Sequence, residues 1–162
     1  MPKIDHSVIP VKTGSSYPGK LSAQMDGRSQ QSLSKASGLT QFGANLVTLA
    51  PGALSSLRHW HENQDEFLVV TSGVCTLIDE HGETDLHTGE TAAFPAGDAN
   101  GHHLVNKTNS PATFVVVGTR TPTERAHYSD IDMKVTVDQS GFNFTNKDGI
   151  PTVDDKTEAI LV

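Results

Sequence analysis

Short apolar runs, separated by glycine, proline and polar residues, follow one another along the middle of this chain. The clearest runs lie in residues 39–52, 66–72, 74–79 and 113–120. Apolar and polar side chains alternate within several of them, which is typical of half-buried β-strands, and the Gly and Pro residues between them are typical of turns. No segment has the pattern of a long helix. About eight short strands, with turns roughly every 6 to 12 residues, predict an all-β domain built as a sandwich, jelly roll or barrel.

Composition and charge exclude several classes of partner. The 162 residues suit one domain, and 12 Lys and Arg against 19 Asp and Glu give a net charge of −7. An acidic chain without basic clusters argues against nucleic-acid partners and anionic membranes. No apolar run approaches the roughly 18 residues of a membrane span. The N-terminus has no apolar signal-peptide core, so we expect no secretion signal.

The single cysteine gives an expectation about compartment. Cys75 lies within an apolar run that we interpret as strand interior. One cysteine cannot form an intrachain disulfide, and a buried thiol in such a position is inert rather than reactive. We therefore expect a cytoplasmic protein.

Candidate chemistry lies between Gly52 and Gly73. His59 and His61 are two residues apart, so on a strand their imidazoles project from the same face. A short polar break follows, and Glu66 then opens the next apolar run. Two His from one strand and a carboxylate from its neighbour form a 2-His-1-carboxylate metal site in outline. The competing interpretation is three polar residues on a solvated strand face.

The same stretch resembles the first motif of the cupin superfamily, and a second stretch resembles the second motif. The first motif is matched by Gly52, His59, His61, Glu66 and Gly73, and the second by Gly89, Pro95, Gly97, His102 and Asn106. One extra residue precedes His59 and two precede His102, and both insertions fall in expected loops, where they are tolerated. The motifs cover residues 39–120. The sequence between and after the motif positions, to about residue 150, is also similar to that of small bacterial cupins of unassigned function.

The resemblance implies a double-stranded β-helix, which is a jelly-roll barrel, with a metal near its centre. Its ligands would be His59, His61, Glu66 and His102. The alternation of side chains along a strand agrees with His102 as a ligand, because His102 and Asn106 lie on one face of a strand and His103 lies on the other. Two alternatives stay open: His103 could replace His102, and Glu62 could replace Glu66. The implied cofactor is one divalent transition metal, namely Fe, Mn, Ni, Co or Zn.

Three segments follow from this interpretation. Residues 1–25 would be an N-terminal arm, residues 26–120 the cupin barrel, and residues 121–162 a C-terminal extension and tail. Strand-like pieces at 7–11 and 133–137 could cover exposed sheet edges. Similar cupins commonly dimerise, so we expect a homodimer formed through such an arm or extension.

Residues beside the ligands have simpler interpretations. Arg58 and Trp60 alternate with the two His and should point away from the metal. We expect Trp60 to pack against a neighbouring strand or a second subunit, and Arg58 to form a surface or interface ion pair. His127 and Tyr128 could line the mouth of a pocket if the C-terminal extension folds back.

Function is predicted only in outline. We expect a metal-dependent enzyme that acts on a small oxygenated substrate, with isomerase, lyase or dioxygenase chemistry. No second acid–base pair or nucleophile is recognisable, so the metal would carry catalysis. The alternative is a metal-dependent ligand-binding or sensor protein without turnover, and the third candidate is a structural barrel. In each of the first two cases the partner is a small molecule, not a nucleic acid or a membrane.

Overall fold

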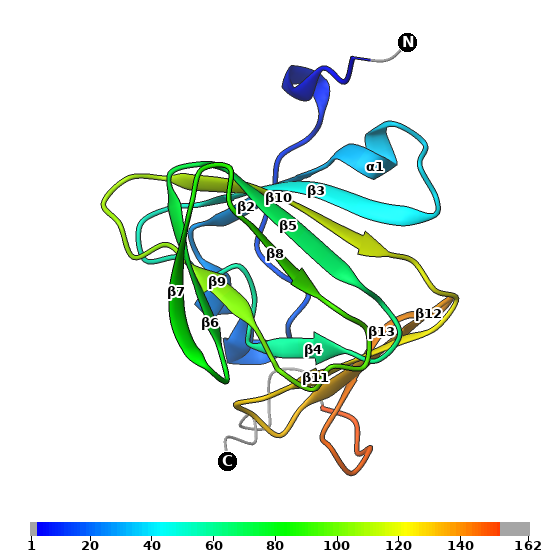
Figure 1. The fold of residues 1–162 in the computed structure, drawn as a ribbon. Helices are drawn as coiled ribbons and strands as arrows, with labels where there is room; N and C mark the ends of the chain where they lie inside the picture. Colours follow the sequence, from blue (N-terminus) through cyan, green and yellow to red (C-terminus); the bar gives the residue numbers. More distant parts are fainter. Residues whose placement is uncertain (1–2, 153–162) are drawn as a thin grey trace.

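Three antiparallel sheets make up the fold in the computed structural model, which describes residues 3–152 (Figure 1). The six-stranded sheet has the order β1 (Lys12–Thr13), β2 (Arg28–Ser32), β3 (Phe42–Leu49), β10 (Ala112–Thr119), β5 (Glu66–Ser72), β8 (Thr91–Phe94). The three-stranded sheet has the order β7 (Gly82–His87), β6 (Val74–Asp79), β9 (His103–Val105). The four-stranded sheet has the order β13 (Gly141–Thr145), β12 (Lys134–Asp138), β11 (Glu124–Tyr128), β4 (His59–His61).

Helical structure is short. Two 3-10 helices, η1 (His6–Val8) and η2 (Gly19–Met25), lie in the N-terminal segment, and one α-helical turn, α1 (Leu33–Ala36), follows β2. Residues 29–35 thus contain most of β2 and most of α1. The expected strand at 7–11 does not form, since its first residues belong to η1. No helix within residues 3–152 is long and apolar enough to span a membrane.

The main hydrophobic core lies between the six-stranded and three-stranded sheets. Its buried side chains come from β3, β5, β6, β7, β9 and β10, and include Val47, Leu49, Leu68, Val70, Cys75, Leu86, Leu104 and Phe114. Alternate residues of each strand enter this core, because successive strand side chains point to opposite faces. Two sheets closed over one core form the predicted all-β jelly-roll barrel. Burial raises the pKa of the Cys75 thiol to about 11, so this thiol is protonated at neutral pH.

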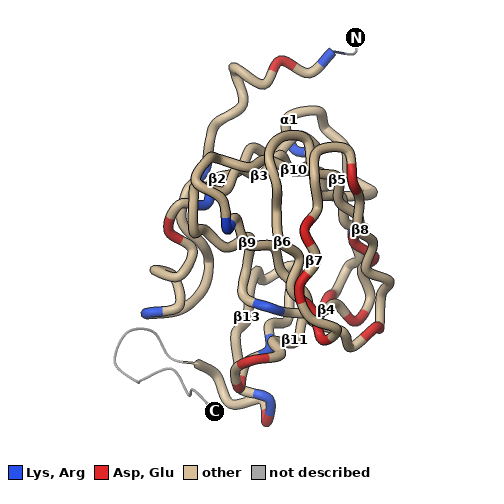
Figure 2. The backbone as a smooth tube through the Cα atoms, turned by 60° about the vertical axis from the view of Figure 1, so that its left-hand side comes forward, with Lys and Arg blue, Asp and Glu red and all other residues tan. Residues whose placement is uncertain are grey.

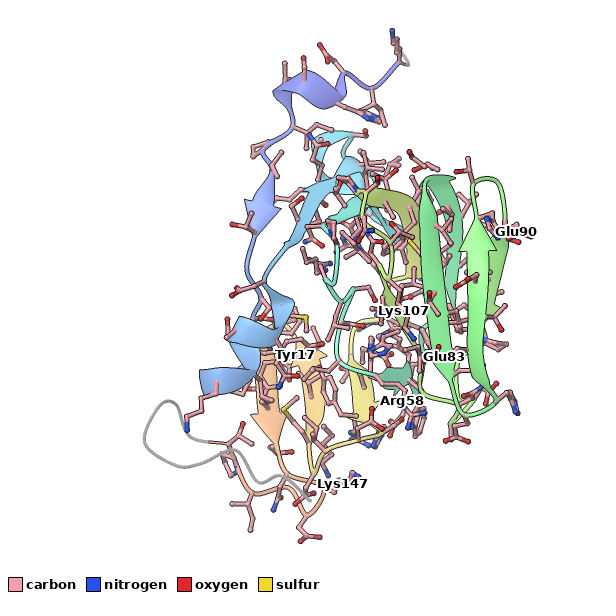
Figure 3. All side chains as sticks on the ribbon, turned by 90° about the vertical axis from the view of Figure 1, so that its left-hand side faces the viewer. Tyr17, Arg58, Glu83, Glu90, Lys107 and Lys147 are labelled. Carbon is pink, nitrogen blue, oxygen red and sulfur yellow. The ribbon has the colours of Figure 1, made fainter. Side chains whose placement is uncertain are left out.

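A second core joins the two ends of the described chain. Leu21 of η2 packs with Tyr128, Met133 and Val135 of the four-stranded sheet and its turn. Tyr17 reaches into the same cluster, with its ring 5.6 Å from that of Tyr128 in an edge-to-face arrangement (Figure 3). Residues 121–152 of the expected C-terminal extension and tail therefore pack as part of the folded structure. The last part of the expected tail, 153–162, lies outside the described residues.

Asn106, the last residue of the second motif, has a structural role. Its side chain is fully buried, and its Nδ2 donates to the carbonyls of Leu49 (2.9 Å) and Ser110 (2.8 Å). Its Oδ1 accepts from the Thr108 N–H at 3.0 Å. Because every polar atom of the amide is bonded, the residue fixes the β9–β10 connection without an unsatisfied buried group.

Candidate metal centre

Strand β4 places His59 and His61 on the inner side of the barrel. It pairs with β11, where His61 lies opposite Ala126 and His59 opposite Tyr128. Both opposing residues are buried, and cross-strand partners share a face, so both imidazoles point inward. The residue between them, Trp60, points outward and stacks on His127, with ring centroids 4.4 Å apart. Trp60 thus packs against a neighbouring strand, one of its two expected environments.

Glu66 reaches the same space from the first position of β5. Leu68 and Val70 share its side of the strand and are buried in the main core. Its cross-strand neighbour on β8 is Phe94. The carboxylate therefore lies at the edge of the barrel interior, where the core gives way to a cavity.

His102 is held beside His59 by backbone pairing. The two residues form a bridge with two hydrogen bonds, of 3.2 and 2.9 Å, just before β9 begins. The imidazole of His102 is 4% exposed and stacks on the ring of Phe94, with centroids 3.4 Å apart and planes within 3°. Leu104 and Asn106 are buried on the same side, as alternation predicts. All four predicted ligands are thus brought together.

The donor atoms of the four residues lie near one another but not close enough to bind one ion together. His59 Nε2 lies 3.2 Å from His61 Nε2, and the Glu66 carboxylate lies 3.8 Å from His61 Nε2 and 3.5 Å from His102 Nε2. As they stand, the side chains of residues 3–152 form no group of three or more His, Cys, Asp and Glu that could hold a metal ion. Ligand atoms that each lie about 2.1 Å from one ion are roughly 3 Å apart from one another. The observed distances between the donor atoms exceed this value by less than about 1 Å.

Several imidazole nitrogens in this cluster have no hydrogen-bond partner, and one of them, His102 Nε2, is among the converging donors. His61 Nδ1 and both ring nitrogens of His102 are buried without a hydrogen-bond partner among the described residues. Such groups are costly and uncommon in native proteins. His59 Nδ1 donates to the Leu57 carbonyl at 2.8 Å, which leaves the lone pair on Nε2, toward the other donors. The residues present therefore fit a divalent metal.

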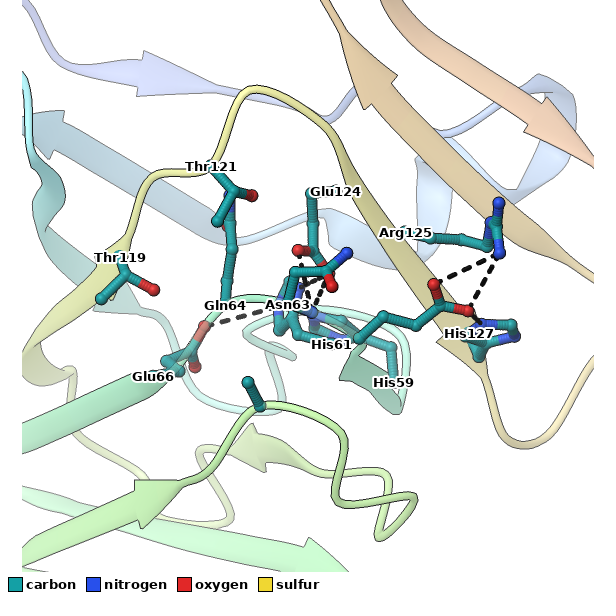
Figure 4. A network of polar contacts seen from close by, with 12 residues as sticks. His59, His61, Asn63, Gln64, Glu66, Thr119, Thr121, Glu124, Arg125 and His127 are labelled. Carbon is teal, nitrogen blue, oxygen red and sulfur yellow. Dashed lines mark hydrogen bonds and ion pairs between the residues drawn. The ribbon is translucent and has the colours of Figure 1, made fainter.

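The sequence did not point to Glu124, a buried carboxylate on β11. It is 3% exposed, and its Oε1 lies 3.5 Å from His61 Nδ1, too far and too poorly aligned for a hydrogen bond. Its oxygens accept from the Asn63 N–H at 3.3 and 3.1 Å (Figure 4). A carboxylate behind a ligating imidazole orients the ring and sets its tautomer. Only the pairing of β11 with β4 brings Glu124 to His61, and local sequence gives no signal of this pairing.

Burial and mutual proximity set the protonation of the site. Burial, with a smaller effect of His61, lowers the pKa of His59 to about 4, so its ring is neutral at pH 7. Burial by itself would raise the pKa of Glu66, but the contact with His102 and the neighbouring His outweigh it and lower that pKa. Neutral imidazoles and an ionised carboxylate are the forms that bind metal.

The two alternative ligands are engaged elsewhere. Glu62 accepts from His127 Nε2 at 2.7 Å and from Arg125 at 3.2 Å, and His127 packs on the outward-facing Trp60. His103 Nδ1 lies 3.0 Å from the Ser56 carbonyl, and burial lowers the pKa of this ring. Geometry therefore favours Glu66 and His102.

Arg58 forms the expected ion pair on the outer side of the barrel. Its guanidinium contacts the carboxylate of Asp130 at 2.6 Å. Asp130 is well exposed, so this pair is screened by water and adds little stability.

A cavity of about 900 Å³ opens onto the four donors. Its walls come from the barrel interior, the N-terminal segment and β11–β13, and Tyr128 is one of them. His127, by contrast, packs on Trp60. One of the two residues expected at a pocket mouth therefore lines the cavity.

Comparison with known proteins agrees with this fold. The sequence pattern of the Cupin domain family matches residues 45–118. A crystal structure of a sugar phosphate isomerase of the cupin superfamily from Silicibacter pomeroyi is similar at 60% sequence identity and a TM-score of 0.92, over 94% of this chain and 97% of that one. The chain is a member of the cupin superfamily.

More distant structures share the fold of this cupin. A protein from Acidithiobacillus ferrooxidans, provisionally described as a sugar phosphate isomerase, is 24% identical with a TM-score of 0.74, over 89% of this chain and 91% of that one. The polyketide cyclase RemF from Streptomyces resistomycificus is 19% identical with a TM-score of 0.61, over 74% and 79% of the two chains. No curated protein matches the sequence.

Proposed function

We propose that this cupin is a metal-dependent isomerase of a small phosphorylated sugar, and that it works in the cytoplasm. The observation that carries the proposal is the convergence of three imidazole Nε2 atoms and the Glu66 carboxylate at one side of a large cavity. The resemblance to the Silicibacter pomeroyi protein supports the substrate class.

The chain's own residues would each have a defined part. His59, His61, His102 and Glu66 would hold the ion, and Fe, Mn, Ni, Co and Zn all suit this donor set. When bound, such an ion polarises a substrate carbonyl. Glu124 would keep the ring of His61 turned toward the ion, and the apolar walls, including Leu68 and Phe114, would exclude water from the substrate.

A turnover assay tests this proposal. The metal-free full-length chain is reloaded with each of the five metals and incubated with a panel of aldose and ketose phosphates, and the products are followed by NMR. We expect metal-dependent interconversion of one aldose–ketose pair, abolished in His59→Ala. Metal-loaded protein that converts no member of the panel would contradict the isomerase proposal. Tight ligand binding without conversion would instead support the alternative of a sensor protein.

A further inference from the structure

Arg28 is a cation on the inner side of the barrel that the proposed metal site does not use. In the β2–β3 pairing it lies opposite Leu49, and Gln30 lies opposite Val47. Leu49 and Val47 are fully buried in the main core, so Arg28 and Gln30 also face the interior. Both line the cavity that opens onto the four donors.

The guanidinium of Arg28 has spare hydrogen-bonding capacity. Its Nε donates to the Ser55 carbonyl at 2.6 Å and its Nη2 to Gln30 Oε1 at 2.7 Å. A guanidinium has five N–H donors, and both of these partners are neutral. No carboxylate among residues 3–152 lies within ion-pair distance of it. Burial lowers the pKa of Arg28, as expected for a cation whose charge is not compensated.

The carboxylates that line the same cavity are already engaged. Asp65 accepts from the Ala96 N–H at 2.8 Å, and Glu124 accepts from Asn63. Asp138 accepts from the Ser140 N–H at 2.8 Å, and Glu66 faces the three His. Residues 3–152 therefore offer no carboxylate partner for the Arg28 charge, and a half-buried cation of this kind is costly unless a ligand supplies the anion.

A second cation lies on the same face. Lys12 on β1 is paired directly with Gln30 and also lines the cavity. The surrounding sequence adds positive charge, because residues 1–58 hold six Lys and Arg against two acidic residues. Residues 59–106 hold nine acidic residues and no Lys or Arg. Figure 2 shows this separation, with acidic residues gathered on β7 and its neighbours, away from β2.

The same loop connects Arg28 with the donor cluster. Ser55, which accepts from Arg28, precedes Ser56, whose Oγ lies 3.4 Å from His59 Nδ1. A ligand that contacted Arg28 would thus extend along this wall of the cavity toward His59.

We propose that Arg28, assisted by Lys12, binds the phosphate group of a phosphorylated substrate. The planar fork of Arg28 matches two phosphate oxygens, and Lys12 supplies a point charge beside it. The identity of the rest of the substrate rests on the proposed function, whereas the anion site itself rests on the geometry of Arg28.

Calorimetric titration of the full-length, metal-free chain with inorganic phosphate tests the anion site. We expect binding to the native chain, and a loss of affinity on the order of tenfold in Arg28→Gln, as for removal of a charge-assisted contact. Lys35→Gln is the matched control, because it removes one positive charge from an exposed position on α1 outside the cavity. Its affinity should match that of the native chain. No binding up to about 10 mM phosphate, or equal losses in Arg28→Gln and Lys35→Gln, would overturn the proposal.

Two milder variants decide the matter if Arg28→Gln does not fold. Arg28→Lys keeps the charge but loses the fork, and Lys12→Gln alters an exposed residue on a two-residue strand. Each should weaken phosphate binding severalfold, and unchanged affinity in both would contradict the site.

A hexose phosphate and the uncharged hexose separate a substrate from a free anion. The hexose phosphate should bind more tightly than inorganic phosphate, and the hexose alone should give no measurable heat. Equal affinity for the hexose phosphate and phosphate would overturn the assignment to a substrate. Metal content of the native chain, measured in parallel, separates the two proposals. Bound metal without phosphate binding removes only this inference, and Arg28-dependent phosphate binding without bound metal removes only the metal-dependent isomerase.

Discussion

His59 stays neutral because it is buried among other imidazoles. An unfolded His has a pKa of about 6.5, whereas burial lowers that of His59 in the folded chain to about 4. Protons therefore bind the unfolded chain more readily between these values. The stability that the neutral ring contributes is complete above about pH 6.5 and is lost as pH falls toward 4.

The lowered pKa of His59 predicts how the stability of the metal-free protein depends on pH. The free energy of unfolding should fall by on the order of 3 kcal/mol between pH 6.5 and 4 through His59. Urea unfolding of the native chain and of His59→Gln, across this range, measures the difference. The variant should show the shallower dependence, and parallel curves for the two proteins would contradict the lowered pKa.

Glu124 offers a second residue-scale prediction. Glu124→Gln should lower metal affinity by about 10- to 100-fold, because in the proposed metal-bound state the Glu124 carboxylate would accept from His61 Nδ1 and orient that ring. Glu62→Gln is the control, since Glu62 is bound to His127 and Arg125 on the outer side of the sheet. A competition titration with a metal chelator measures both. Equal affinities in the two variants would leave Glu124 without a positioning role.

The four candidate ligands could be selected from sequence, while Glu124 and Arg28 could not. His59 and His61 share strand parity, and His102 is marked by its spacing to Asn106, so local pattern carries the information. Glu124 is brought to His61 only by the pairing of β11 with β4, and Arg28 enters the cavity only through the β2–β3 register. Such contacts depend on long-range pairing, which local periodicity does not determine.

At the scale of elements, the approach to β9 controls the position of His102. Gly101 lies directly before this residue, and a Cβ at Gly101 would collide with the side chain of Ser129, meeting its Oγ and lying 3.1 Å from its Cβ. The Oγ can rotate away, but the Cβ cannot. The absence of a side chain at Gly101 thus lets the two segments approach closely.

Gly101→Ala should therefore shift His102 and destabilise the protein by about 1–3 kcal/mol, as overpacking does. Thermal unfolding and metal content measure the two effects. Gly43→Ala is the control, because its Cβ would meet only ordinary contacts of 3.6 Å or more. Adding Ser129→Gly to Gly101→Ala should restore both properties, and a failure to rescue would contradict the steric explanation.

The central strands were predictable, and the strands after residue 120 were only partly so. Runs of apolar residues predict the strands β3, β5, β6 and β10 from local sequence alone. β12 was expected as a strand-like piece. β11 and β13 are richer in polar residues, and they become strands because β11 pairs with β4 and the N-terminal segment covers their inner face.

At the scale of the whole molecule, we propose that the N-terminal arm contributes to a homodimer. The arm stands away from the barrel before β1 (Figure 1). It exposes Val8 and Val11, at 75% and 63%. Two exposed apolar side chains on an extended segment suit a contact with a second copy.

Substituting both valines by serine tests the dimer without removing the second core, which a truncation at residue 25 would damage. Light scattering should give twice the mass of one chain for the native protein and a shift toward the single mass for Val8→Ser/Val11→Ser. A single-chain mass for the native protein at micromolar concentration would contradict the dimer. An unshifted dimer in the variant would move the contact from the arm to the sheets.

The metal content of purified variants shows whether His59, His61, Glu66 and His102 form one metal centre. After dialysis against a divalent transition metal, elemental analysis of the native chain should find about one ion per chain. His59→Ala and His102→Ala should lose it, whereas His103→Ala should retain it, because its imidazole faces the Ser56 carbonyl instead. Full occupancy in both His59→Ala and His102→Ala, or loss of the ion in His103→Ala alone, would contradict the proposed centre.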